Sequence, residues 1–285
     1  MTTQMSMTTP RKGRLRVSPR ARRAAQKLGL DITAISGSGF NGRIVEAGVL
    51  RTTGPRRPVA APLPAPTGKM QTFEVSAMRM AVARRTTESF STVPHFYVRA
   101  EADVTALLET RRQLLEPIEK EYNIRVTLTD FIIYAQALAL RDNPLANRIW
   151  QNEKIVQFPT CNIGILVSLD DGLLIPVIAQ ADQLGLVGLA SKRAQLVAAA
   201  RAGKMPADNQ SCPTAVSNLG TTRVDDFIAI IPPPQSSVLA IGRAAPRPYV
   251  VDGQLAVRQT MYLCLSIDHR VLDGMIAGNY LGRVV

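Results

Sequence analysis

Residues 259–274 read QTMYLCLSIDHRVLDG, an apolar run that ends in a cluster of charged residues and a glycine. The large apolar residues from Gln259 to Ile267 predict a buried strand. Gly274 opens the last helix that the sequence predicts. A side chain directly after a buried strand projects from the edge of the sheet, where a substrate can reach it. His269 holds this position, and Asp273 follows four residues later.

The chain has only two histidines, His95 and His269. Imidazole is the commonest general base at neutral pH, so a histidine-dependent enzyme with this sequence must use one of the two. His95 begins a predicted strand, and we expect it to line that strand rather than to contact a substrate. His269 is therefore the candidate base. The alternative, from spacing alone, is a structural histidine whose ring nitrogens form hydrogen bonds within the protein at the end of the strand.

The body of the chain alternates predicted helices and strands. This order predicts an α/β fold with a mixed sheet covered by helices. No run of about 18 apolar residues is present, so we expect no membrane span. Helices are predicted at 76–91, 104–122, 129–141, 186–202 and from 274 onward, and strands at 95–102, 160–169, 173–178, 214–217, 228–231, 237–243 and 259–267.

Charge is concentrated near the N-terminus. Residues 1–69 contain 13 of the 34 Lys and Arg residues but only two of the 22 acidic residues, Asp31 and Glu46. A basic segment of this kind suits nucleic acid, anionic lipid or an acidic protein surface. It has few aromatic side chains on which bases could stack, which makes binding of single-stranded nucleic acid a weaker interpretation.

The three cysteines, Cys161, Cys212 and Cys264, are far apart and odd in number. They show neither the spacing of metal ligands nor a disulfide framework, so we expect buried thiols in a reducing compartment. The expected location is the cytoplasm. The mitochondrial matrix is the alternative, because residues 1–23 are rich in arginine and nearly free of acids, as transit peptides are.

Several segments resemble, in order, the catalytic domain of the 2-oxo acid dehydrogenase acyltransferases, the E2 enzymes. DHRVLDG resembles the H-x-x-x-D-G signature of that family, which chloramphenicol acetyltransferase shares more loosely. The resemblance implies a chloramphenicol-acetyltransferase-like fold, a homotrimer with active sites between neighbouring subunits, and no metal. The other matching segments are AVARRTTESFSTVPHFYVRAEADVTAL (81–107), TLTDFIIYAQALAL (127–140), NIGILVSLDDGLLIPVIAQAD (162–182), TAVSNLG (214–220) and VDDFIAIIPPPQSSVLAIG (224–242).

The resemblance also implies roles for three residues, with coenzyme A and lipoamide as substrates. His269 would take the proton from the thiol of coenzyme A, which attacks the thioester of acyl-dihydrolipoamide. Ser217 would donate a hydrogen bond to the resulting oxyanion. The alternative for Ser217 is a turn residue before Asn218. We expect Asp273 to support local structure through an ion pair with an arginine, rather than to act as a second base.

Residues 18–50, SPRARRAAQKLGLDITAISGSGFNGRIVEAGVL, resemble the peripheral subunit-binding domain of E2 chains. The resemblance implies docking of E1 or of E3 (dihydrolipoyl dehydrogenase), with Arg22 and Arg43 on matching basic positions. Gln26 stands where another basic residue is common in the family. The expected organisation is a disordered N-terminus (1–13), a subunit-binding domain (14–50), a Pro/Ala-rich linker (51–72) and a catalytic domain (73–285).

Two departures from the family pattern lead to further expectations. Nothing before Pro19 resembles a lipoyl domain, so we expect the lipoyl group in trans, on another chain or on a domain that this sequence lacks. The last helix stops at LGRVV, which predicts isolated trimers rather than a larger shell. The missing lipoyl domain keeps open a second hypothesis, a non-catalytic scaffold or E3-binding component, although a scaffold does not need the histidine.

Overall fold

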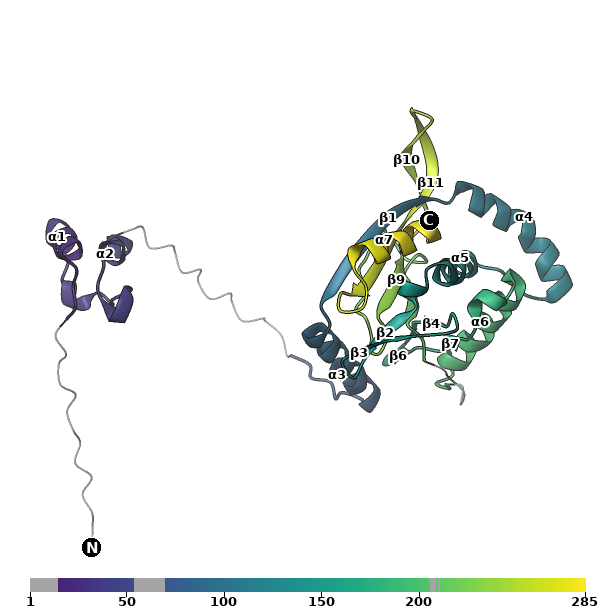
Figure 1. Ribbon diagram of the computed structural model, residues 1–285, viewed down its shortest axis with the longest axis horizontal. Coiled ribbons are helices and arrows are strands. Elements are labelled where there is room, and N and C mark those ends of the chain that lie inside the picture. Colours follow the sequence, from purple (N-terminus) through teal and green to yellow (C-terminus); the bar gives the residue numbers. More distant parts are fainter. Residues whose placement is uncertain (1–14, 54–69, 206–208, 210) are drawn as a thin grey trace, which may run out of the picture. The chain divides into compact units, whose positions relative to one another are not determined.

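The computed structural model of the protein describes residues 15–53, 70–205, 209 and 211–285. The expected disordered segment 1–13 and most of the expected linker lie outside these residues. The chain forms two compact units, one within residues 1–72 and the other within 73–285 (Figure 1). No helix of the described chain is long and apolar enough to cross a membrane.

The small unit is built from two short helices around a glycine-containing loop. The hydroxyl of Ser18 accepts a hydrogen bond from the Ala21 amide at 3.1 Å, and proline occupies the next position, where a missing N–H costs little. Gly29 ends the first helix with a φ of +64°, which favours glycine. The elements of the small unit are α1 (Pro19–Lys27), η1 (Ile32–Ala34), η2 (Phe40–Gly42) and α2 (Glu46–Thr53). Its core consists of Ala21, Ala25, Ile35, Ile44 and Val49.

The large unit is a mixed α/β structure, as the sequence predicts. Its helices are α3 (Ala77–Thr92), α4 (Thr105–Tyr122), α5 (Leu128–Asp142), η3 (Pro144–Ala146), η4 (Ala181–Gln183), α6 (Leu186–Arg201) and α7 (Gly274–Val284). Its strands are β1 (His95–Asp103), β2 (Arg148–Gln151), β3 (Lys154–Gln157), β4 (Ile163–Ile165), β5 (Val167–Leu169), β6 (Gly172–Leu174), β7 (Val177–Ile178), β8 (Thr214–Asn218), β9 (Ser237–Ile241), β10 (Ala245–Val251) and β11 (Gln254–Asp268).

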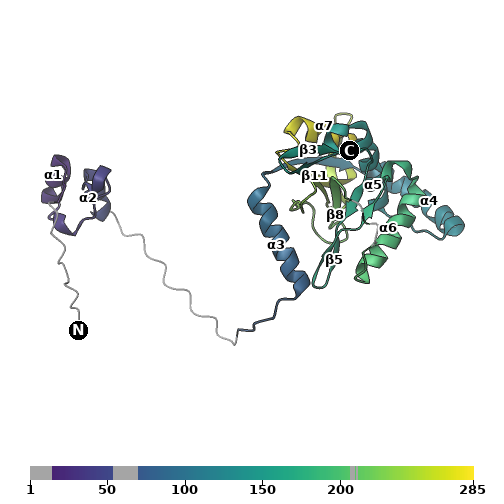
Figure 2. The ribbon, with the colours of Figure 1, turned by 60° about the horizontal axis from the view of Figure 1, so that its bottom comes forward.

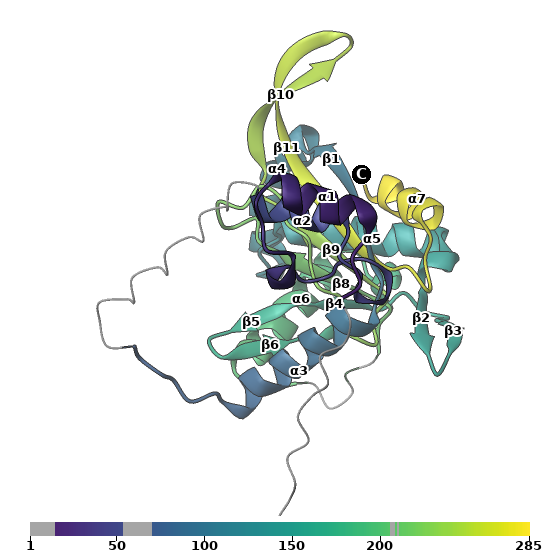
Figure 3. The same cartoon turned by 90° about the vertical axis from the view of Figure 1, so that its left-hand side faces the viewer.

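One central sheet organises the large unit. Its strand order is β1-β11-β9-β8-β4-β7, and β10 pairs with the far part of β11. The β8 strand runs parallel to β4 and β9, whereas the other pairs are antiparallel. The β10–β11 hairpin projects beyond the body of the sheet (Figure 3). On the opposite side, α3 runs alongside the β5–β6 hairpin (Figure 2).

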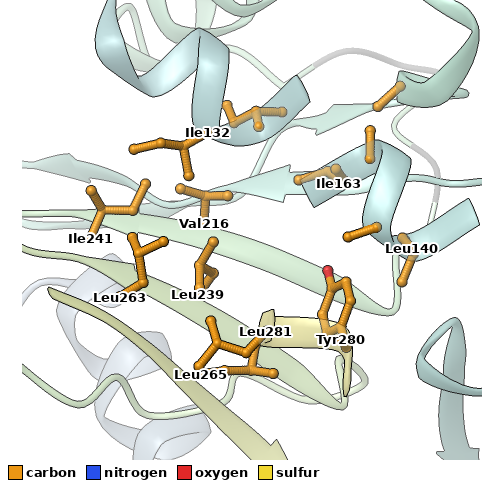
Figure 4. Close-up of a cluster of buried hydrophobic side chains, with 14 of the residues drawn as sticks. Ile132, Leu140, Ile163, Val216, Leu239, Ile241, Leu263, Leu265, Tyr280 and Leu281 are labelled. Atoms are coloured by element: carbon orange, nitrogen blue, oxygen red, sulfur yellow. The ribbon is translucent and has the colours of Figure 1, made fainter. Parts of the chain in front are cut away.

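The two faces of the sheet are covered differently. Successive residues of a strand point to opposite faces, so β8 sends Val216 to one core and Ala215 to another. The larger core lies between the sheet and helices α5 and α7, where Ile132, Leu140 and Tyr280 pack on the strands (Figure 4). The smaller core lies on the other face, where the segment before β9 covers the strands.

Three details differ from the sequence-based predictions. Residues 228–231 form no strand: the amide of Ile231 donates to His95 and its carbonyl accepts from the hydroxyl of Ser89, so neither group pairs with a strand. The expected strand at 160–169 is divided into β4 and β5, and the expected strand at 173–178 into β6 and β7. The β2–β3 and β10–β11 hairpins were not predicted, although Asp252 and Gly253, with φ of 50° and 78°, form the Asp-Gly turn that marks a tight hairpin.

Candidate active site

His269 is the first residue of the turn that follows β11. Its amide donates a hydrogen bond to the carbonyl of Pro94 at 2.9 Å, which ties the turn to the start of β1. Its ring meets the ring of Phe96 edge to face, with 5.1 Å between centroids. The side chain is exposed. The imidazole is therefore held in place by an aromatic neighbour and remains accessible to a substrate.

A buried ion pair holds the turn that carries His269. Asp268 is only 1% exposed, and its carboxylate accepts hydrogen bonds from Nη2 of Arg270 at 2.7 Å and from Nε at 3.0 Å. The same carboxylate accepts the amide of Arg270, and the guanidinium lies 5.3 Å from the centre of the Trp150 ring. Hydrogen bonding to Asp268 raises the pKa of Arg270. Sequence reasoning missed the roles of these residues, although the opposite charges directly before and after His269 indicate that Asp268 and Arg270 can form an ion pair.

Asp273 supports local structure, but not in the predicted way. Its carboxylate accepts a hydrogen bond from the amide of Ile276 at 2.8 Å, which makes it the N-cap of α7. Within the described chain it forms no ion pair, since the nearby Arg270 is bound to Asp268. The expected ion pair with an arginine is not formed within the described residues, where the carboxylate instead satisfies an amide of the first helical turn.

Ser217 lies on β8, half-buried, in the wall of a cavity of about 830 Å³. The next residue, Asn218, is fixed by two hydrogen bonds: its amide nitrogen donates to the hydroxyl of Thr129 at 2.7 Å, and its oxygen accepts from the amide of Gly220 at 2.6 Å. Most of the cavity wall is apolar and comes from α3, from residues 173–177 and from the segment before β9. The cavity thus presents the Ser217 hydroxyl, with those of Thr86 and Ser211, in mainly apolar surroundings.

Ser217 and His269 of one chain lie far apart. Ser217 pairs with Ala240 of β9, which pairs with Cys264 of β11, five residues before His269. Two strand spacings across the sheet and five residues along it separate the two positions by roughly 15–20 Å. His269 is not among the described residues that line the cavity. A single chain therefore does not bring this hydroxyl and this imidazole to one reacting atom.

His95 has a structural position at the start of β1. Its Nε2 accepts a hydrogen bond from the amide of Ile231 at 3.1 Å, so its Nδ1 carries the proton and donates to the carbonyl of Val93 at 2.8 Å. The ring therefore fastens the loop before β9 to the sheet. This position agrees with the expectation that it lines the strand.

The three cysteines are buried free thiols, as expected. Burial raises the pKa of Cys161 to about 12 and the pKa values of Cys212 and Cys264 to about 11. Such thiols stay protonated at neutral pH and do not act as nucleophiles. Among the residues that the structure describes, no group of three or more His, Cys, Asp or Glu side chains could hold a metal ion.

In the small unit, the predicted partner-binding residues Arg22 and Arg43 both have exposed side chains. Arg22 lies on α1, and Arg43 follows η2 directly, next to Ile44, whose backbone pairs with Val17 before α1. Both guanidinium groups are available to a carboxylate on another protein.

Two family models match this chain. The model described as the catalytic domain of 2-oxoacid dehydrogenases acyltransferase matches residues 67–285, and the model described as the e3 binding domain matches residues 15–50. Together they account for both compact units of the structure.

Curated relatives align over nearly the whole chain. The acetyltransferase component of the pyruvate dehydrogenase complex of Zymomonas mobilis is 34% identical over 94% of this chain and 63% of its own length. The acetyltransferase component of the acetoin cleaving system of Bacillus subtilis is 35% identical over 95% of this chain and 68% of its own length. The chain thus spans about two thirds of the length of these relatives.

Solved structures share the fold of the large unit. A probable dihydrolipoamide acetyltransferase from Listeria monocytogenes superposes with a TM-score of 0.72 at 33% identity, over 75% of this chain and 92% of that one. The cubic core of the pyruvate dehydrogenase multienzyme complex superposes with the same TM-score at 28% identity, over 79% of this chain and 95% of that one.

Proposed function

Because this chain belongs to the family of 2-oxoacid dehydrogenase acyltransferases, we propose that it transfers an acyl group between dihydrolipoamide and coenzyme A. The observation that carries the proposal is the accessible imidazole of His269, held by Phe96 and by the Asp268–Arg270 pair at the end of β11. Curated relatives named as acyltransferase components support the reaction class.

The chemistry follows from the two side chains. A free thiol is mostly protonated at neutral pH, so the His269 ring takes the proton from the sulfur of coenzyme A. The thiolate attacks the carbonyl carbon of the acyl thioester, forming a new C–S bond and placing negative charge on the oxygen. The Ser217 hydroxyl donates a hydrogen bond to that oxygen. Collapse breaks the old C–S bond, and the imidazolium returns its proton to the departing lipoyl sulfur.

We propose that the active unit contains more than one copy of the chain, with the homotrimer as the simplest assembly. The separation of roughly 15–20 Å between Ser217 and His269 supports this, because the mechanism needs both groups at one tetrahedral centre. A site between copies takes its imidazole from one chain and its hydroxyl from a neighbour. Closed cyclic symmetry repeats the same site at every interface.

We propose that the small unit docks E1 or E3 subunits through Arg22 and Arg43. The match of residues 15–50 to the e3 binding domain supports this proposal, as does the exposure of both guanidinium groups. Lipoamide is the proposed acyl-carrying substrate. The proposed location is the cytoplasm, in agreement with three buried thiols that suit a reducing compartment.

The test is transfer of acyl groups from acyl-coenzyme A to dihydrolipoamide by the purified chain. His269→Ala should lower kcat by about 100- to 10,000-fold and Ser217→Ala by about 100- to 1,000-fold, with the oligomeric state unchanged. Cys161→Ala, which removes a buried thiol of the larger core on the face of the sheet opposite Ser217, is the matched control and should keep kcat. Near-normal turnover by His269→Ala would refute the assignment.

A further inference from the structure

The cavity that holds Ser217 is apolar next to the hydroxyl of that residue. Side chains two residues apart on a strand point to the same face, so Ser217 shares its face with Ala215, a member of the smaller core. Leu166, Ile175 and Phe227 pack against the same core and also line the cavity. An acyl group whose oxygen accepts a hydrogen bond from Ser217 therefore has these apolar side chains around it.

Buried residues close the floor of this cavity. Val177, Cys212 and Ala229 line it, and each is less than a tenth exposed. Gly164 lies behind two of the lining side chains, since a methyl group added there would lie 2.8 Å from Cγ2 of Ile175 and 3.0 Å from Sγ of Cys212. Because this position is glycine, both side chains sit back against the sheet and leave room in front of them.

The shape of the substrates decides which group reaches the closed floor. In the tetrahedral intermediate of the proposed reaction, the reacting carbon carries the oxyanion, the two sulfurs and the acyl chain. Each sulfur continues into a long arm that has to leave the cavity, toward the nucleotide of coenzyme A or toward the amide end of dihydrolipoamide. The acyl chain has a free end, and it is therefore the group that can fill the floor.

The floor has no positive charge for an acidic acyl group. Among the described residues that line the cavity, Arg85 is the only charged one, and its side chain is exposed on α3. The side-chain amides are engaged within the wall. Nε2 of Gln235 donates to Sγ of Cys212 at 3.2 Å. Oδ1 of Asn209 accepts a hydrogen bond from the amide of Val177 at 2.9 Å. A carboxylate on the floor would lose its hydration without gaining a cation, which is costly.

We propose that the transferred acyl group is neutral, apolar and larger than acetyl, a chain of about four or five carbons such as isobutyryl or isovaleryl. Leu166, Ile175 and Ala229 determine this preference, because they form apolar surface that the chain covers. The methyl group of acetyl leaves most of that surface unfilled, and each further buried methylene strengthens binding about fourfold. This inference rests on the acyl transfer proposed above and adds the class of acyl group to it.

Binding of acyl-coenzyme A thioesters to the full chain measures this preference without turnover, because no acceptor is present. Isothermal titration with acetyl-, isobutyryl- and succinyl-coenzyme A gives the dissociation constants. Isobutyryl-coenzyme A should bind about tenfold more tightly than acetyl-coenzyme A. Succinyl-coenzyme A should bind at least about tenfold more weakly than isobutyryl-coenzyme A. In transfer to dihydrolipoamide, the values of kcat/KM should follow the same order.

Substitutions in the floor should change the preference in opposite directions. Ala229→Leu narrows the floor and should reduce the preference for isobutyryl- over acetyl-coenzyme A about tenfold. Ile175→Ala widens the floor and should strengthen binding of hexanoyl-coenzyme A relative to isobutyryl-coenzyme A about fivefold. The matched control is Ala106→Leu, which adds the same side chain at an exposed position of α4 and should leave both preferences unchanged. Circular dichroism checks that each variant is folded.

The outcomes separate this inference from acyl transfer itself. Preferential binding of isobutyryl-coenzyme A without any turnover would refute the proposed reaction and keep the apolar floor. Equal dissociation constants for the acetyl and isobutyryl thioesters, tightest binding of succinyl-coenzyme A, or no binding of any thioester would overturn the proposed acyl class. A preference that survives both floor variants would overturn the role of Ala229 and Ile175.

Discussion

Replacing Arg270 by methionine should destabilise the turn that carries the candidate base. The Asp268 side chain is 2% exposed and Arg270 is 31% exposed, so the substitution leaves a carboxylate buried beside a single remaining amide donor. Breaking a buried pair by removing one partner costs about 3–5 kcal/mol. Solvent reaches part of the Arg270 guanidinium and weakens the pair, so we expect a loss of about 2–3 kcal/mol in the free energy of unfolding. Methionine keeps apolar contact with Trp150, which confines the loss to the ion pair.

Thermal and urea unfolding at fixed protein concentration measure this loss. For a unit of this size, about 2–3 kcal/mol corresponds to a fall in Tm of about 4–12 °C. The double variant Asp268→Asn, Arg270→Met removes both charges and should recover part of the loss, giving a coupling energy of at least about 1 kcal/mol. If Arg270→Met unfolds within about 0.5 kcal/mol of the parent chain, the ion pair does not hold the turn and the reasoning fails.

Three other substitutions or conditions test separate parts of the structure. Asp273→Ala should cost about 1 kcal/mol by removing the cap of α7, and Asp273→Ser should restore most of it in urea unfolding; equal losses would contradict the capping role. Gly37→Ala places a methyl group 2.0 Å from the carbonyl oxygen of Gly42, so it should unfold the small unit, seen as loss of E3 binding with normal acyl transfer. The three thiols should resist a thiol reagent at pH 8 until the chain unfolds. Above about pH 9 the thiols of the unfolded chain ionise while the buried thiols of the native chain stay protonated, so the free energy of unfolding should fall as the pH rises. Labelling of the native chain at pH 8 would contradict the burial of the thiols.

The alternation of helices and strands was predictable because each long element carries its own signals. Ser18 and Pro19 begin α1, and Thr127 with Asp130 forms the capping box that begins α5. The segment at 228–231 was not predictable, because its β-branched residues favour a strand and only the surrounding fold decides whether a partner strand is present. Its alternating burial, with Ile231 buried and Ile228 exposed, gives the same pattern as an edge strand.

The site was only partly predictable from sequence. His269 stood out because histidine is rare in this chain and follows a buried strand. The contacts of Phe96 and Trp150 with the turn at 268–270 arise from residues more than 100 positions away, which no local pattern reveals. The wide separation of Ser217 from His269 follows from the order of the strands in the sheet, and sequence motifs do not give that order.

The measurement that tests the central claim most directly is complementation between two inactive variants. Chains carrying Ser217→Ala and chains carrying His269→Ala are mixed in equal amounts, unfolded and refolded together. If each site takes its imidazole from one copy and its hydroxyl from a neighbour, random mixing leaves both groups intact in about one site in four, so about a quarter of the parent activity should return. A mixture as inactive as either variant alone would contradict a site shared between copies.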